Sequence, residues 1–109
     1  MPETRVFVSH SSQDVAWCRP LVAALRTAGY TCFYDEDSIP GTSAWVKMIE
    51  QGVQDCDVFI LVLTPVAWSS RWVGEEVQLA LVKDKRILVL VHETAHVEGL
   101  LLTRQWRAA

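Results

Sequence analysis

The chain has 109 residues, of which 50% are hydrophobic and 21% are charged, so it can form one domain with a buried core. It carries 10 basic and 13 acidic residues, a net charge of −3, and no basic block, which argues against nucleic-acid binding. No apolar run approaches the roughly 20 residues that cross a membrane, and the first residues do not resemble a signal peptide.

Short apolar runs alternate along the chain with segments whose apolar residues recur every three or four positions. The first run, Arg5–Val8, precedes a predicted helix over Asp14–Ala28, in which Pro20 predicts a kink or a late start. Three more strands are predicted, over Thr31–Tyr34, Asp57–Leu63 and Arg86–Val91. Loops are predicted over Asp35–Thr42 and Thr64–Arg71, and helices over Ser43–Gln54 and Trp72–Lys83. The segment His92–Ala109 is ambiguous, with a loop, a short helix or a short edge strand near Arg104–Trp106 as alternatives.

This alternation predicts an α/β fold with a parallel sheet and helices on both of its faces. In such sheets ligands bind beyond the carboxyl ends of the strands. A glycine-rich phosphate loop would be usual at that edge, but neither GxGxxG nor GxxxxGK[ST] occurs in the sequence. Any nucleotide must therefore be held in another way.

Trp72 and Glu76 lie four positions apart in a predicted helix and so share one of its faces near the carboxyl edge of the sheet. An aromatic ring beside a carboxylate could stack on a flat ring and hold a sugar hydroxyl or a developing cation there. The structural alternative is simpler, because the helix dipole favours acidic residues in the first turns and a tryptophan can belong to the core. Spacing alone favours the structural interpretation.

Four segments carry motifs in a fixed order along the chain. They are Val6–Asp14, an apolar strand ending in Ser-x-Ser before an Asp; Gly29–Asp35 followed by Ile39-Pro40-Gly41; Asp57–Pro65, an apolar strand before Thr-Pro; and Ser70–Glu76, which contains W-x-x-x-E. Together they resemble the Toll/interleukin-1 receptor (TIR) domain family nearly from end to end. The resemblance implies a single domain over residues 1–109 with a flavodoxin-like, three-layer fold of four to five parallel strands.

The resemblance implies two kinds of function, of which the first is enzymatic. Some TIR domains cleave NAD+ at the nicotinamide–ribose bond, giving nicotinamide with ADP-ribose or a cyclic ADP-ribose isomer. Their catalytic residue is the Glu of W-x-x-x-E, here Glu76, whereas Glu75 has the wrong register. Because Trp72 and Glu76 are both present, we expect an NAD+ nucleosidase of immune or defence signalling, with NAD+ as substrate and no cofactor or metal.

Further residues are expected to surround the substrate in an enzymatic TIR domain. The expected substrate-binding residues are Trp72, Trp45, Ser9, Ser11, Ser12 and Asp35. The serines could bond phosphate or ribose, although Ser11 and Ser12 could instead only cap the following helix. Asp35 could bond a hydroxyl or merely close the turn after the second strand.

The alternative from a different class is a non-catalytic TIR scaffold that acts by self-association. Such modules assemble through the so-called BB loop, and the corresponding assembly loop here contains Ser38, Ile39, Pro40 and Gly41. Enzymatic members are also expected to assemble, since relatives often complete the site with a neighbour's BB loop. The expected partners are therefore NAD+ and other TIR domains, with no nucleic acid and no membrane.

The sequence also departs from the family pattern. Enzymatic relatives often carry arginines where Ser11 and Ser12 lie, so phosphate recognition must come from the backbone, from Arg71 or from a neighbouring subunit. His96 is a weak candidate for the aromatic residue that often follows the fourth strand. The helix that usually follows the last strand is absent, which predicts that the chain is the N-terminal part of a longer protein.

The chain has three widely spaced cysteines, which indicate reduced thiols in a cytoplasmic protein.

The segment His92–His96 has the sequence HExxH, in which two histidines on a helix can bind zinc beside a glutamate base. The position of a third ligand is occupied by Leu102, and Glu98 lies too close in sequence to serve. The preceding run Arg86–Val91 predicts a strand, so the motif would lie in a loop, where the two histidines would not align. A zinc peptidase therefore stays a remote alternative to two solvent-facing histidines.

Overall fold

A computed structural model of the chain describes residues 4–36, 41–91 and 106–108. Its strands form one five-stranded, entirely parallel sheet in the order β2-β1-β3-β4-β5. The strands are β1 (Arg5–Ser9), β2 (Thr31–Phe33), β3 (Val58–Leu63), β4 (Arg86–Val91) and β5 (Trp106–Ala108). The prediction of four to five parallel strands is confirmed, and of the alternatives near Arg104–Trp106 the edge strand is the one that forms, as β5.

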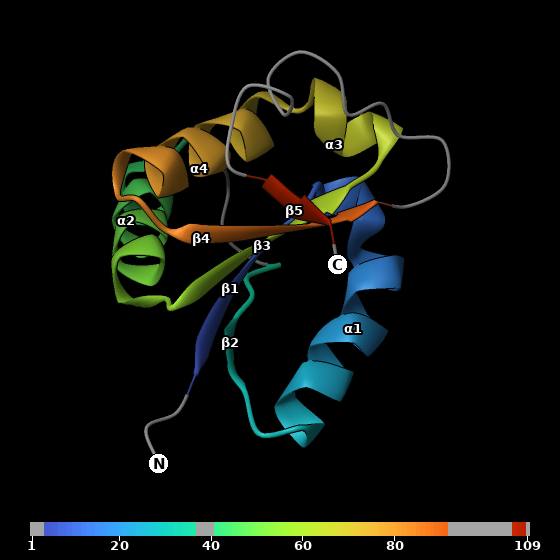
Figure 1. The fold of residues 1–109 in the computed structure, drawn as a ribbon. Helices are drawn as coiled ribbons and strands as arrows, with labels where there is room; N and C mark the ends of the chain where they lie inside the picture. The colour runs from blue at the N-terminus through green and yellow to red at the C-terminus, as the bar shows by residue number, and fades with distance from the viewer. Residues whose placement is uncertain (1–3, 37–40, 92–105, 109) are drawn as a thin grey trace.

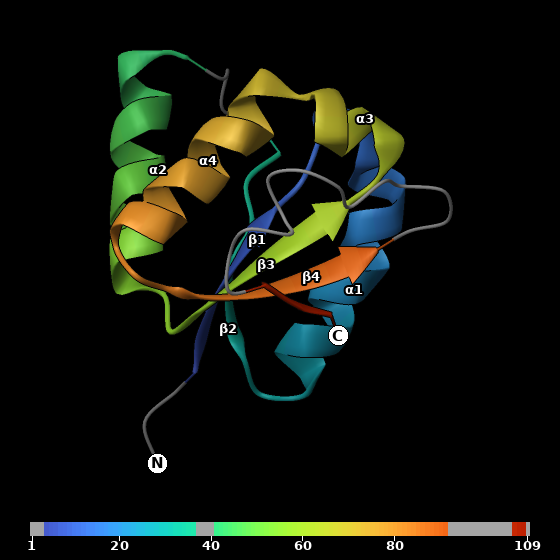
Figure 2. The ribbon, with the colours of Figure 1, turned by 45° about the horizontal axis from the view of Figure 1, so that its top comes forward.

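Helices cover both faces of the sheet, which gives the predicted three layers. The helix α1 (Val15–Thr27) packs on one face, whereas α2 (Ser43–Asp55) and α4 (Arg71–Val82) lie together on the other (Figures 1 and 2). This division follows from the alternation of side chains along each strand. In β1, Phe7 faces the core under α2 and α4, while Val6 and Val8 face the core under α1.

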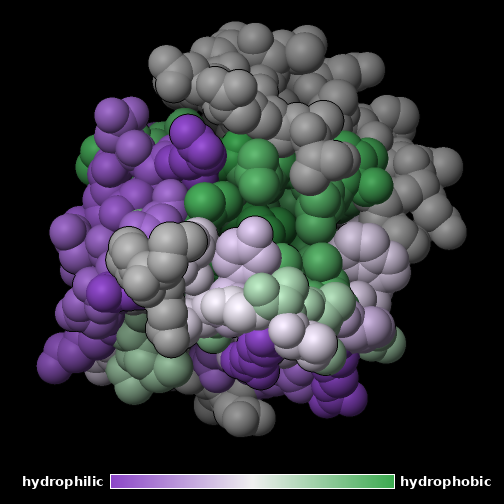
Figure 3. Space-filling model, turned by 60° about the horizontal axis from the view of Figure 1, so that its bottom comes forward, coloured by the Kyte–Doolittle hydropathy of each residue, from purple (hydrophilic) through white to green (hydrophobic). Residues whose placement is uncertain are grey.

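The two cores differ in composition. Under α2 and α4 the rings of Phe33, Phe7 and Phe59 form a stacked row across three strands, with centroids 5.0 and 5.1 Å apart. Under α1 the core is mainly aliphatic, and Leu88 and Leu90 of β4 are only partly buried there. Figure 3 shows a hydrophobic area directly beside strongly hydrophilic surface on one side of the molecule.

The three cysteines are free thiols.

The first helix begins one residue after its predicted start at Asp14, and it does not start late at Pro20. A 3-10 turn, η1 (Ser12–Asp14), comes first, and the Ser11 hydroxyl caps it by accepting a hydrogen bond from the backbone N–H of Gln13. The α-helical part then begins at Val15 and continues through Pro20. Gly29 follows its end with a φ of 100°, the conformation that glycine adopts most easily after a helix.

One predicted element is wrong. The predicted loop Thr64–Arg71 contains a short helix, α3 (Pro65–Ser69), before α4 begins. Thr64 caps α3 by accepting a hydrogen bond from the N–H of Ala67, and Pro65 occupies the first turn, where it needs no donor. A five-residue helix is too short to show a helical period, so capping rather than patterning determines it.

The strand order reverses direction between β1 and β3. The chain leaves β1 to form β2 on one side and then crosses to form β3 on the other side of β1. Loops that leave neighbouring strands in opposite directions open a crevice at their carboxyl ends, and flavodoxin-like sheets bind ligands there. A ligand site is therefore expected at the segments that follow Ser9, Phe33 and Leu63.

Candidate active site

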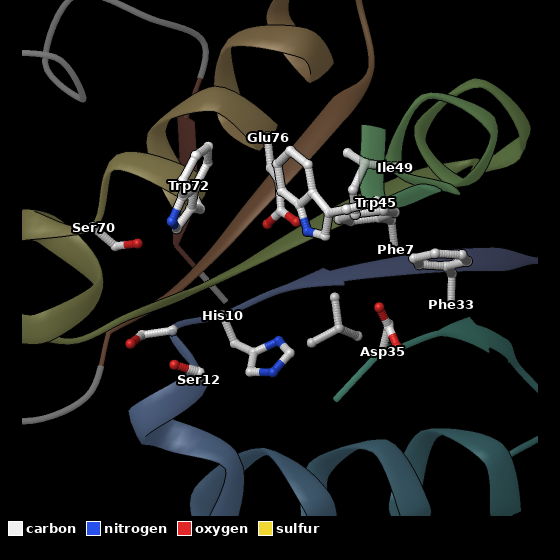
Figure 4. Close-up of a pocket in the computed structure, with 12 residues that line it drawn as sticks. Phe7, His10, Ser12, Phe33, Asp35, Trp45, Ile49, Ser70, Trp72 and Glu76 are labelled. Atoms are coloured by element: carbon white, nitrogen blue, oxygen red, sulfur yellow. The ribbon is translucent and has the colours of Figure 1, made fainter. Parts of the chain in front are cut away.

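A pocket of about 80 Å³ lies at this carboxyl edge, between the ends of the strands and the helices α2 and α4 (Figure 4). Its lining residues are Phe7, Val8, His10, Ser11, Ser12, Phe33, Asp35, Trp45, Ile49, Ser70, Trp72 and Glu76. Six of the seven residues predicted for catalysis and substrate binding are among them. Ser9 is not part of the lining, but its hydroxyl contacts the carboxyl group of Glu76.

Glu76 lies on the face of α4 that packs against the sheet, beside the buried residues Val73, Val77 and Ala80. The helix begins where the Ser70 hydroxyl accepts a hydrogen bond from the N–H of Val73. Figure 4 shows the carboxyl group of Glu76 directed into the pocket. Only 9% of the residue is exposed. Glu76 is therefore a rare buried carboxyl group at a place where the fold binds ligands.

Ser9 holds this carboxyl group from the end of β1. Its fully buried hydroxyl donates a hydrogen bond of 2.6 Å to Oε1 of Glu76. This distance lies at the short end of the range for O–H···O hydrogen bonds. Ser9 was predicted to bond phosphate or ribose, whereas in the structure its hydroxyl is directed at the carboxyl group.

The surroundings of Glu76 disfavour its charged form. The pKa of Glu76 is raised to about 8, mainly by burial; the hydrogen bond from Ser9 lowers it, and the negative charge of Asp35 contributes a smaller increase. Shifts of this size are common among catalytic groups. The surroundings of Glu76 therefore favour the protonated form of its carboxyl group at a higher pH than in a free side chain.

Two tryptophans form one wall of the pocket. The rings of Trp45 on α2 and Trp72 on α4 meet edge to face, with centroids 5.5 Å apart and planes at 67°. Gly41 lies against Trp72 so closely that a Cβ atom at that position would be 2.7 Å from Cη2 of the ring. The predicted pair Trp72 and Glu76 is thus brought together in one pocket.

The charged neighbours of this pair lie outside the pocket lining. The guanidinium of Arg71 lies 4.7 Å from the ring centroid of Trp72 and 3.5 Å from a carboxylate oxygen of the half-exposed Glu75. Glu75 is directed away from the pocket, as the register of W-x-x-x-E implies. Arg71, considered above for phosphate recognition, is engaged by the tryptophan and by Glu75 in this structure.

Ser11 and Ser12 line the pocket, and Ser11 also caps the 3-10 turn. The two interpretations of Ser11 are therefore compatible, because one side chain can do both. Asp35 lies at the end of β2 and directs its carboxylate into the pocket (Figure 4). Of the assembly loop, Gly41 is described, while Ser38, Ile39 and Pro40 lie outside the described residues.

His10 is a pocket residue that the sequence analysis missed. Its ring packs on Tyr34, with centroids 4.6 Å apart, and it lies between Ser12 and Asp35 in Figure 4. Burial lowers the pKa of His10 below its usual value of 6.5, so the imidazole is neutral at pH 7. Its position next to Ser9 at a strand end was the available signal.

The HExxH segment His92–His96, which includes the pocket candidate His96, lies outside the described residues. Among the residues that the structure describes, no group of three or more His, Cys, Asp or Glu side chains is arranged to hold a metal ion. Within the same ranges, no helix has the length and apolar character required to cross a bilayer.

A family model of the TIR domain matches residues 6–108. The chain belongs to the TIR domain family. This TIR domain is 31% identical, over 97 residues, to the probable 2′ cyclic ADP-D-ribose synthase TcpB of Brucella melitensis biotype 1, covering 84% of the chain and 39% of that protein. It is 24% identical, over 95 residues, to the probable 2′ cyclic ADP-D-ribose synthase TcpO of Methanobrevibacter olleyae, covering 84% of the chain and 28% of that protein. The chain thus spans less than half the length of these relatives.

Solved structures agree with the fold. The TIR domain of the Toll-related receptor TRR-2 from Hydra magnipapillata superimposes with a TM-score of 0.78 at 20% identity, covering 94% of this chain and 82% of that one. The CMP N-glycosidase BcmB of Clostridium botulinum superimposes with a TM-score of 0.75 at 19% identity, covering 97% and 87%. At these identities the likeness establishes the flavodoxin-like fold of the TIR domain and nothing about its substrate.

Proposed function

We propose that this TIR domain cleaves NAD+ at the bond between nicotinamide and ribose, with Glu76 as the catalytic carboxylate. The observation that carries the proposal is the buried Glu76, held at 2.6 Å by Ser9 beside two tryptophans at the carboxyl edge of the sheet. The names of TcpB and TcpO, cyclic ADP-D-ribose synthases, support NAD+ as the substrate.

The reaction requires little more than a well-placed negative charge. Nicotinamide leaves as a neutral molecule from a cationic pyridinium, so the leaving group needs no proton. The ribose passes through an oxocarbenium-like state, which a nearby carboxylate stabilises. Water then gives ADP-ribose, and attack by another group of the same molecule gives a cyclic isomer.

The remaining pocket residues are assigned supporting roles in substrate binding. Trp72 and Trp45 stack on the substrate, Ser11 and Ser12 bond ribose or phosphate, and Asp35 bonds a hydroxyl. A pocket of about 80 Å³ is small beside the roughly 300–1,000 Å³ of typical ligand sites, so substrate entry requires rearrangement. Assembly of several copies through the loop Ser38, Ile39, Pro40 and Gly41 would provide it, in a cytoplasmic defence or immune signalling role.

The test is NAD+ consumption by the purified protein, measured over a range of protein concentrations beside Glu76→Gln and Glu75→Gln. We expect at least a 100-fold loss in Glu76→Gln, in the range seen when a group that stabilises transition-state charge is removed. Glu75→Gln should keep wild-type activity, because its side chain is directed away from the pocket. Activity per molecule should rise with protein concentration, and chromatography of the product separates hydrolysis from cyclisation.

Two outcomes would support other functions. If no assembled form consumes NAD+, while the protein still self-associates, the chain is a non-catalytic TIR scaffold. If cleavage of a peptide substrate depends on Glu93 and on bound zinc, the HExxH segment is the functional motif. Including Glu93→Ala in the same series makes the second outcome visible.

A further inference from the structure

A partly buried hydrogen bond joins two loops at the carboxyl edge of the sheet. The hydroxyl of Thr64, which directly follows β3, donates to Oδ2 of Asp14 over 2.7 Å, although the two residues lie 50 positions apart in the chain. Thr64 itself is buried, with 4% of the residue exposed. Neither residue lines the pocket of Glu76. The bond therefore belongs to the support of the pocket and not to its surface.

The side chain of Asp14 is used in an unusual way for its position. Asp14 directly precedes α1, where an aspartate commonly accepts a hydrogen bond from an N–H group in the first turn of the helix. Its side chain makes no such capping bond. The carboxyl group is bonded instead to Thr64, so two distant loops are joined while the helix lacks the usual cap.

On the side of Asp14, the bond holds the segment that carries the pocket serines. In the described structure, the chain makes no strand pairing between the end of β1 and the start of β2. The backbone N–H of Asp14 donates to the carbonyl of Ser11 over 2.9 Å, which connects Asp14 directly to a pocket residue. Ser11 and Ser12 are thus held between the end of β1 and Asp14, whose partner is Thr64.

On the side of Thr64, the same hydroxyl begins the segment that leads to the opposite wall of the pocket. It accepts a hydrogen bond of 3.0 Å from the N–H of Ala67 and so caps α3, which lies near the start of α1 (Figures 1 and 2). A single residue, Ser70, separates α3 from α4, the helix of Trp72 and Glu76. One hydroxyl thus connects the serine segment to the helices on the other side of the crevice.

The carboxyl group of Glu76 has a separate support. Ser9, which donates to it, is paired with Leu61 in the sheet, and Glu76 lies on α4 beside residues that are buried in the core. Loss of the bond between Asp14 and Thr64 would leave these contacts in place. It would release the serine segment from the helices opposite, so the expected effect is on substrate binding rather than on the chemical step.

We propose that Asp14 and Thr64 are positioning residues: their hydrogen bond holds Ser11 and Ser12 at the distance from α4 that the ribose and phosphates of the substrate require. The proposal rests on the proposed function, in which the two serines bond these groups. Asp14 and Thr64 both belong to motifs of the sequence, the Asp after Ser-x-Ser and the Thr of Thr-Pro. The positioning role gives each of them a part in the site.

Paired substitutions separate the effect of the bond from the stability of the fold. Asp14→Ala removes the acceptor, whereas Asp14→Asn keeps an oxygen that can accept from Thr64. Thr64→Ser keeps the hydroxyl and is the second conservative variant. Asp55→Ala is the matched control, because it removes another side-chain hydrogen bond, of 2.8 Å from Gln51, at the last residue of α2. Thermal unfolding of each variant sets an assay temperature at which all of them are folded.

The measurements are kcat and KM for NAD+ and the binding of ADP-ribose by calorimetry, which needs no turnover. In Asp14→Ala we expect KM and the Kd for ADP-ribose to rise about tenfold, because small displacements of binding groups are costly, while kcat changes less than about twofold. Asp14→Asn and Thr64→Ser should stay within about threefold of the wild type, since each keeps the hydrogen bond. Asp55→Ala should match the wild type. A variant that was only partly folded would instead lose kcat at an unchanged KM, because fewer molecules would be active.

The proposal is overturned if Asp14→Ala retains the wild-type KM and Kd, if its kcat falls instead, or if Asp14→Asn is impaired as strongly. Its failure is distinct from that of the proposed function. Binding of ADP-ribose that Asp14→Ala weakens, without NAD+ consumption, would retain the positioning role and remove the enzyme. NAD+ consumption that depends on Glu76, with an unchanged KM in Asp14→Ala, would do the reverse. A protein that neither consumes NAD+ nor binds ADP-ribose would overturn both.

Discussion

At the scale of single residues, Ser9 is the group whose effect on Glu76 can be tested most directly. Its hydroxyl stabilises the carboxylate, and the hydrogen bond lowers a pKa that burial and Asp35 raise. Removing it in Ser9→Ala should therefore raise the pKa of Glu76 above 8. We expect NAD+ cleavage at pH 7 to fall about tenfold for each pH unit of this shift, and to recover at pH 9.

The pH profile separates this positioning role from a loss of fold. A protein that is merely destabilised loses activity at every pH, whereas the shifted profile is specific to the carboxyl group. Ser69→Ala, at an exposed position in α3, is the matched serine control and should leave the profile unchanged. An unshifted profile in Ser9→Ala would contradict the assigned role.

The residue scale also shows what sequence alone can predict of a site. Trp72 and Glu76 were predicted together because four positions along a helix fix their relation. The bond between Ser9 and Glu76 joins residues 67 positions apart, and only the parallel pairing of β1 with β3 and the packing of α4 create it. The bond from Ser9 to Glu76 could therefore not be predicted from the sequence, and the substrate-binding role expected of Ser9 stays a prediction.

At the scale of elements, Gly41 couples the end of the assembly loop to the pocket wall. Its φ is 86°, and a Cβ atom would lie 2.7 Å from the ring of Trp72. Gly41→Ala should strain the backbone and also displace the ring. Gly29→Ala is a matched control, because Gly29 has a similar φ of 100° but open space around it.

Both substitutions should lower the free energy of unfolding by roughly 1–2 kcal/mol, the cost of a left-handed backbone for alanine. Only Gly41→Ala should change the fluorescence of the tryptophan pair and raise KM for NAD+, because only there does a methyl group meet Trp72. Thermal unfolding, fluorescence and kinetics measure the three effects. Equal fluorescence and KM in the two variants would show that the contact has no influence on the pocket.

Elements with a clear period were predicted well. The central strand β3 was recognised because it is apolar on both faces, as expected between two helical layers. The helix α3 was missed because its proline and serines are typical of loops, and its stability comes from the Thr64 cap and the burial of Ala67. Local hydrogen bonds of this kind have no periodic signature.

At the scale of the whole molecule, the buried carboxyl group links stability to pH. Glu76 has a pKa near 4.5 when unfolded and about 8 when folded, so the folded state binds the extra proton between these values. Its contribution to stability is complete below about pH 4.5 and is lost as pH rises through 8. His10 acts in the opposite sense below pH 6.5, where its unfolded form gains a proton that the folded form resists.

Between pH 6.5 and 8.5 Glu76 makes the largest contribution to the change in stability. The unfolded imidazole of His10 is still half protonated at the lower limit, and the buried thiols Cys18 and Cys56, whose pKa values are raised to about 12 and 11, affect stability only near the upper limit, where unfolded thiols begin to ionise. Across this range we expect the wild type to lose about 2 kcal/mol of stability, or about 8 °C in Tm. Glu76→Gln carries no ionisable group and should have a nearly constant Tm. Parallel slopes for the two proteins would mean that Glu76 is already ionised in the folded state at neutral pH.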